Sequence, residues 1–176
     1  MGKQLGSELI GLNIAWLRQA LDLVERIDDT IFAISPEGLA PHRVGSHLRH
    51  VVEFYECFLD GFPFARIDYD RRKRDTAIEK DRRSAAAAIR TMVRRLEQLS
   101  EVVNDHALAV RMENGDEDAW LRSSFNREMQ ALSSHTIHHF ALIAVTLKLH
   151  GTDADPDFGM SPSTLRYQAT KSREAA

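Results

Sequence analysis

Two histidines four positions apart are the residues of this sequence best placed to do chemistry. His135 and His139 lie in a segment with helical periodicity, where four positions correspond to about 40° around the axis and one turn along it. Two imidazoles in this arrangement can bind the same metal ion. They share their side of the segment with four apolar residues, Phe125, Leu132, Leu142 and Ile143. Both rings are therefore predicted to point into the protein, while His138 lies further round and is a weaker candidate.

A third ligand has to come from another element, because two side chains on one helix leave a transition metal undersaturated. The segment 42–60 offers His47 and His50, three positions apart beside an apolar face. Helical geometry leaves both open, with His47 nearer the centre of that face than His50. Three neutral imidazoles would leave coordination positions for water or a substrate, whereas structural zinc sites usually have four protein ligands. The pattern favours an open metal site.

A less specific interpretation is that these histidines are hydrogen-bonded to backbone or carboxylate groups at a helix interface. The HxxxH motif alone fits both interpretations about equally, and the HLRH sequence at 47–50 shifts the balance towards a metal. Thr136 stands where the zincin motif HExxH has its glutamate. Metallopeptidase activity is therefore disfavoured.

Two carboxylates are candidates for acid–base chemistry at such a site. Glu53 follows His50 by three positions, where it would orient an imidazole or act as a base, although a surface carboxylate also fits this position. Glu128 lies two turns before His135, so it would either approach the metal or pair with an arginine. Cys57 follows His50 by seven positions, but a small cysteine in the core is the more frequent role.

The elements that must position these residues are long helices. Helical periodicity occurs at residues 7–29, 42–60, 76–103 and 123–150. Ser7 is suited to cap the first helix, and the proline and glycine residues of 35–41 predict a loop. Between residues 106 and 120 the apolar residues alternate before Asn114 and Gly115, which predicts a short hairpin or an irregular crossover. Residues 1–167 are expected to form one helical domain, and 168–176 a disordered tail.

Composition limits the classes of function. The chain has 176 residues, 43% of them apolar, which is enough for one continuous core. Its 23 basic and 26 acidic residues give a formal charge of -3, which favours neither nucleic acid nor an anionic membrane as a partner. The basic run 71–74 is surrounded by acidic residues, as is typical of a solvated segment. One cysteine and no long uncharged apolar stretch lead us to expect a cytoplasmic, unanchored protein.

Two segments of the chain resemble the DinB-like (DinB/YfiT) superfamily of metal-dependent bundle proteins. They are VGSHLRHVVEFYECFL at 44–59 and REMQALSSHTIHHFALI at 127–143, and the resemblance extends over most of residues 7–167. The segments IDYDRRKRDTAIEKD and FGMSPSTLRY resemble a subgroup of the same family. The chain departs from the family pattern in two ways: it has Pro41 and His42 where many relatives have a tryptophan, and it has His47 in addition.

The resemblance implies an all-α fold, namely a four-helix bundle with a long crossover connection, and commonly a homodimer. It also implies a divalent transition metal, nickel or zinc, bound by His50, His135 and His139. In this alignment His47 is either an alternative ligand or supports a ligand from outside the coordination sphere. Characterised relatives include thiol-dependent transferases and isomerases.

The leading hypothesis is a metal-dependent enzyme, of transferase or hydrolase type, that activates water or a thiol to react with a small-molecule substrate. The alternative is a non-catalytic dimeric bundle that binds a metal or a small molecule. A role in DNA repair lacks support, because the chain has neither a net positive charge nor a recognition helix.

Overall fold

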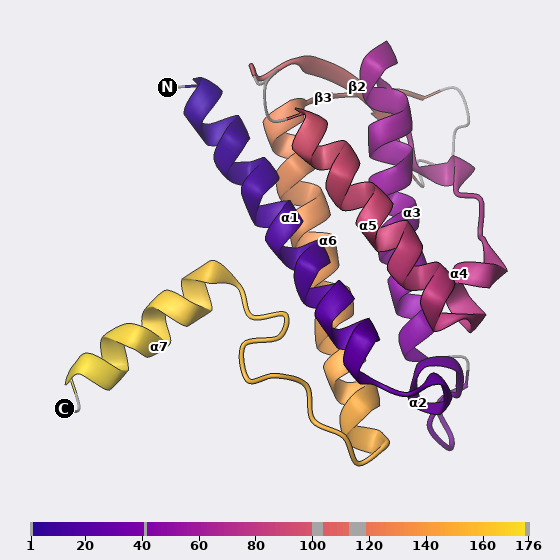
Figure 1. The fold of residues 1–176 in the computed structure, drawn as a ribbon. Coiled ribbons are helices and arrows are strands. Elements are labelled where there is room, and N and C mark those ends of the chain that lie inside the picture. The colour runs from indigo at the N-terminus through magenta and orange to yellow at the C-terminus, as the bar shows by residue number, and fades with distance from the viewer. Residues whose placement is uncertain (1, 41, 100–103, 113–118, 175–176) are drawn as a thin grey trace.

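The computed structural model describes residues 2–40, 42–99, 104–112 and 119–174 of the chain, and the structural statements below concern these residues. Four long helices surround the core: α1 (Gly2–Arg26), α3 (Val44–Gly61), α5 (Arg82–Leu99) and α6 (Phe125–Leu149). Helices α1 and α3 each pack against both α5 and α6, so they lie diagonally across the core. In Figure 1, α1 and α6 run in one direction and α3 and α5 in the other.

The apolar periodicity of each long helix accounts for its buried face. In α3 the buried side chains include those at the spacing that predicted the helix, Val44, Leu48, Val51, Tyr55 and Phe58. Polar groups in this core are hydrogen-bonded, as burial requires. The Tyr55 hydroxyl donates to Oδ1 of Asn13 at 2.7 Å, and Asn13 Nδ2 donates to the Met129 carbonyl oxygen at 3.0 Å. These bonds join α1, α3 and α6.

The shorter helices are α2 (Asp29–Ala33), α4 (Thr76–Lys80) and α7 (Pro162–Glu174), with 3₁₀ turns η1 (Phe62–Phe64) and η2 (Tyr69–Arg71). The sequence predicted one helix over 76–103, but the structure separates α4 from α5 at Asp81. The Asp81 carboxylate accepts backbone N–H bonds from Arg83 and Ser84, and thus caps the start of α5. Residues 100–103 lie outside the described part of the chain.

A small mixed sheet lies at one end of the helices (Figure 1). Its strands are β1 (Arg66–Asp68), β2 (Ala107–Arg111) and β3 (Leu121–Ser124), in the order β1-β2-β3. Strand β1 is parallel to β2, with Ile67 opposite Val110. Strand β3 is antiparallel to β2, with Leu121 also opposite Val110. The alternating residues after 106 thus form a strand, whereas the turn predicted at 114–115 lies outside the described residues.

The sheet overturns the prediction of an all-α four-helix bundle. The described residues form seven α-helices and three strands, so the fold is mostly helical but includes a mixed sheet. Strand β1 was hidden in a charged passage, where Ile67 is the one buried residue between two charged ones. Strand β3 has the sequence LRSS, without alternation, and part of it was assigned to the last long helix. Both strands are stabilised by pairing with β2 rather than by local propensity.

Three further boundaries differ from the sequence prediction. Helix α1 begins at Gly2, so Ser7 lies inside the helix and does not cap it. Ser124 caps α6 by accepting the backbone N–H of Arg127. Residues 168–174 belong to α7, where a disordered tail was predicted, and α7 points away from the other helices in Figure 1. None of the described helices combines the length and apolarity needed to cross a bilayer.

Candidate metal centre

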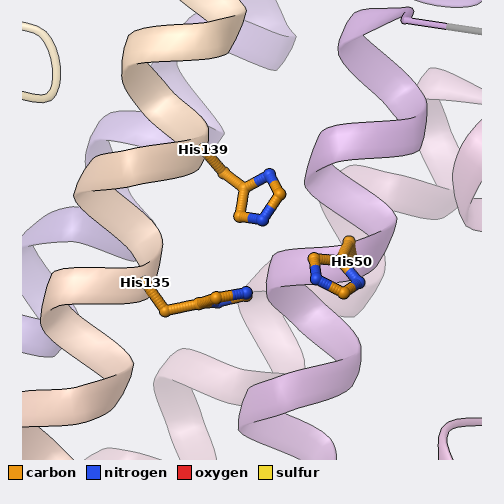
Figure 2. A group of neighbouring side chains, drawn as sticks. All are labelled: His50, His135 and His139. Carbon is orange, nitrogen blue, oxygen red and sulfur yellow. The ribbon is translucent and has the colours of Figure 1, made fainter.

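Three of the predicted ligands meet between α3 and α6. His50 on α3 and both His135 and His139 on α6 each offer one nitrogen, and these nitrogens lie within 4.8 Å of one another. The ring centroids are 4.6 to 4.9 Å apart. Figure 2 shows the three rings gathered in the space between the two helices. The one-turn spacing on α6 and the packing of α3 against it therefore bring together the three histidines that the resemblance selected.

His47 lies next to this group rather than in it. Its Nδ1 is 3.1 Å from Nδ1 of His139, so one ring donates a hydrogen bond to the other. His47 is the more buried of the two α3 histidines, with 7% of its surface exposed. On its other side its ring stacks against His42, with 5.5 Å between centroids. When His139 is the donor in its contact with His47, its Nε2 is unprotonated and able to bind a metal.

Burial keeps these imidazoles neutral over the physiological pH range. Removal from water lowers the pKa of His50 to about 4 and the pKa values of His135 and His139 to about 3. Neighbouring imidazoles and the Arg72 guanidinium add to this lowering, because they repel a second positive charge. The pKa of His47 is lowered to about 4, again mainly by burial. Neutral imidazole is the form that binds metals.

Residues around the triad also fit a bound ion. Nδ1 of His135 is buried and has no hydrogen-bond partner among the described residues, although unpaired buried nitrogens are costly. The Phe54 ring stacks on His135 at 4.0 Å between centroids, and Tyr69 stacks on Phe54 at 5.1 Å. These rings shield one side of the triad from water. Three neutral imidazoles with an unpaired buried nitrogen among them suit zinc, nickel or a similar divalent ion.

Glu128 lines the cavity beside the triad. The carboxylate is buried and accepts two hydrogen bonds, from the Tyr69 hydroxyl at 2.8 Å and from the Ser123 hydroxyl. No arginine pairs with it among the described residues, so the pairing considered from the sequence does not occur. Glu128 is the one carboxylate among the described residues that line this cavity.

Glu53 has a structural position instead. Its side chain is buried, and Oε1 accepts the backbone N–H of Asp75 at 2.8 Å, which holds the segment before α4 against α3. Burial raises the pKa of Glu53. Cys57 lies on a separate groove, and burial raises the pKa of its thiol to about 11. Neither residue lines the cavity that contains the triad.

The cavity over the triad has a volume of about 560 Å³ and lies between α3, α6 and strands β2 and β3. Sequence reasoning missed the residues that β2 and β3 contribute to its wall. The main ones are Val110, Leu121, Arg122 and Ser123. The alternation after residue 106 was a signal for a strand there, but it did not indicate that the strand faces the histidines.

Comparison with known proteins does not assign the chain to a family. No family model matches the chain. The chain is similar to FK506-binding protein 5 of Rhizopus delemar, with 33% identity over 105 residues. This match covers 57% of the chain and 27% of that protein, so the chain spans about a quarter of the length of the curated relative it matches.

Proposed function

We propose that this protein is a metal-dependent enzyme of the DinB-like superfamily, in which His50, His135 and His139 hold a divalent ion, nickel or zinc. The observation that carries the proposal is the approach of three neutral imidazoles to within 4.8 Å of one another beside a cavity of about 560 Å³. Three protein ligands leave positions free for a reacting group. We also propose a cytoplasmic location, which the single cysteine favours, and a homodimer, as the family resemblance implies.

The ion would supply a nucleophile near neutral pH, because a bound divalent metal lowers the proton affinity of a water or a thiol. The side chains around it have separate tasks. His47 fixes the ring of His139 through the 3.1 Å contact between their Nδ1 atoms. Phe54 and Tyr69 exclude water from one side of the triad.

Glu128 is the group best placed to accept a proton from a substrate in the cavity. Each of its oxygens accepts one hydrogen bond from a hydroxyl and retains a further lone pair. Tyr69 and Ser123 therefore hold the carboxylate in place without occupying all of its acceptor capacity. Transfer of a thiol or water to a small molecule is the reaction class that these groups suit, which corresponds to a transferase or hydrolase.

The first test is metal content. Protein purified without a nickel column should contain about one divalent ion per chain by mass spectrometry, and the metal-free protein should bind zinc in calorimetry. His139→Ala should remove binding, whereas His150→Ala, near the end of the same helix and outside the cavity, should retain it. Absence of stoichiometric binding to the wild-type chain would reject the proposal.

Activity is tested separately from binding. Metal-loaded protein is screened with electrophilic small molecules in the presence of thiols, with and without a chelator, and turnover should require the metal. A non-catalytic protein that binds a metal or a small molecule is the second candidate. It is favoured by the position of Glu53, which accepts the Asp75 N–H and does not line the cavity, so it cannot act there as a base. Stoichiometric metal without turnover across the thiol panel supports that candidate.

A further inference from the structure

Two arginines line the same cavity as the histidines. Arg122 belongs to β3 and Arg127 to the first turn of α6, and both side chains are exposed. Within the described part of the chain, neither guanidinium has an ion-pair or hydrogen-bond partner. We call Arg122 and Arg127 the rim arginines.

Several other arginines of the described surface form ion pairs, as Arg26 does with Asp155 at 2.6 Å and Arg82 does with Asp29 at 2.7 Å. Glu128, the carboxylate that lines the described part of the cavity, accepts hydrogen bonds from the hydroxyls of Tyr69 and Ser123 and pairs with neither arginine. The cavity therefore has two cations, one carboxylate and a neutral triad, an arrangement that attracts anions.

Apolar side chains make up most of the remaining wall. They are Phe54, Val110, Met112, Leu121, Ala131 and Leu132. Two of them, Met112 and Leu121, are exposed although large and apolar, with 45% and 57% of their surfaces accessible. A volume of about 560 Å³ lies within the range of about 300–1,000 Å³ typical of small-molecule sites. The cavity thus combines an apolar surface with a cationic rim.

We infer that the cavity binds a small molecule with an apolar body and an anionic group, the anionic group being held by the rim arginines. A guanidinium presents paired N–H donors that match a carboxylate or sulfonate. The inference names a substrate class for the proposed function. It rests on that function for the reaction at the histidines. The binding of the anion itself does not require the metal.

Two dyes with the same ring system test this inference. 8-Anilinonaphthalene-1-sulfonate carries a sulfonate, and N-phenyl-1-naphthylamine lacks it; both fluoresce on entering an apolar site. Dissociation constants are measured by fluorescence for full-length protein, metal-free and zinc-loaded. The variants are Arg122→Gln, Arg127→Gln and the double substitution, and the matched control is Arg166→Gln on α7, an exposed arginine outside the cavity.

The wild-type protein should bind the sulfonate dye at least about tenfold more tightly than the neutral dye. The double variant should lose this difference, while its affinity for the neutral dye stays within twofold and Arg166→Gln behaves as wild type. Equal affinities of wild type for the two dyes, or an equal loss in Arg166→Gln, would overturn the inference. So would a double variant that keeps its preference for the sulfonate.

Zinc calorimetry on the same variants separates the two proposals. If zinc binds to all of them but the dye preference is absent, the anion inference fails and the metal proposal stands. If the dye preference depends on the rim arginines but neither the wild-type protein nor any variant binds zinc, the proposed function fails and the anion site stands. Circular dichroism spectra confirm that each variant is folded, and the exposed positions of both arginines favour this outcome.

Discussion

The helical wall of the cavity, from α3 and α6, carries half-buried imidazoles, whereas the strand wall, from β2 and β3, carries the exposed side chains of Leu121 and Arg122. The helical wall has fixed partners: His47 contacts His139, and Phe54 stacks on His135. Arg122 on the strand wall has no such partner among the described residues. We infer that the first wall holds groups at set positions and that the second receives a ligand.

We expect the two walls to differ in role, the helical wall in binding the metal and the strand wall in selecting the substrate. Residues that bind a metal need fixed geometry and neutral imidazoles, which packed helices provide. Residues that select a substrate need accessible charge and apolar surface, which the small sheet and Arg127 in the first turn of α6 provide. Substitutions on the two walls are therefore expected to affect different measurements.

The largest effect is expected on the helical wall. His135→Gln should weaken zinc binding at least about 100-fold, because one of three ligands is lost. Arg122→Gln on the strand wall should change zinc affinity by less than twofold. Isothermal titration calorimetry on metal-free proteins measures both. Comparable losses in the two variants would show that the walls do not have separate roles.

The next effect concerns the support of a ligand. His47→Phe removes the hydrogen bond to His139 and should lower zinc affinity about 10- to 100-fold without abolishing binding. His47→Gln retains a hydrogen-bonding group at this position and should recover part of the affinity. If His47→Phe binds zinc as wild type does, the contact between the two rings does not position the ligand.

A smaller effect is expected away from both walls. Glu53→Ala removes the acceptor of the part-buried hydrogen bond from the Asp75 N–H and should lower the free energy of unfolding by about 1–2 kcal/mol. Glu53→Gln keeps an oxygen acceptor and should cost about 0.5 kcal/mol or less, since burial already raises the pKa of the carboxyl group. Urea unfolding measures both. Zinc affinity should be unchanged, and a loss of zinc binding in Glu53→Gln would give Glu53 a role at the metal.

The smallest effect is the response of the metal-free protein to acid. The folded-state pKa values of His50 and His135, about 4 and 3, lie below the ordinary value of 6.5. Between pH 6.5 and the folded-state pKa values, the unfolded chain therefore binds more protons than the folded protein. The free energy of unfolding is retained above pH 6.5 and falls as the pH drops towards 4. Partial exposure reduces the loss to on the order of 1–2 kcal/mol.

Urea unfolding of metal-free wild type and His135→Gln at pH 7, 6 and 5 checks this response. The variant lacks one of the buried imidazoles and should lose less stability over the same interval. Identical pH dependence in the two proteins would show that His135 titrates alike in the folded and unfolded states.

The sequence predicted the helical wall better than the strand wall for a physical reason. The i, i+4 spacing of His135 and His139 is a local pattern, and helices preserve local patterns. Angles on a single helix did not separate His47 from His50, because the answer depends on where α6 lies against α3. The family resemblance supplied that information, and the three nitrogens within 4.8 Å agree with it.

The strand wall depends on contacts between distant segments. Strand β1 pairs in parallel with β2, where Ile67 lies opposite Val110, and no local pattern in the charged passage around Ile67 reveals that pairing. The interruption at Asp81 was missed for a related reason. Helical propensity continues through it, and only the capping bonds to Arg83 and Ser84 show where α5 begins.

Helix α7 has a consequence for proteolysis. It has thirteen residues, none of the described ones is buried, and it points away from the rest of the molecule. An isolated helix of this length is only marginally stable in water. Brief trypsin digestion should therefore cleave first at Arg166 or Lys171, leaving a core that retains both walls of the cavity. Protection of these bonds as the protein concentration rises would show that self-association covers the helix.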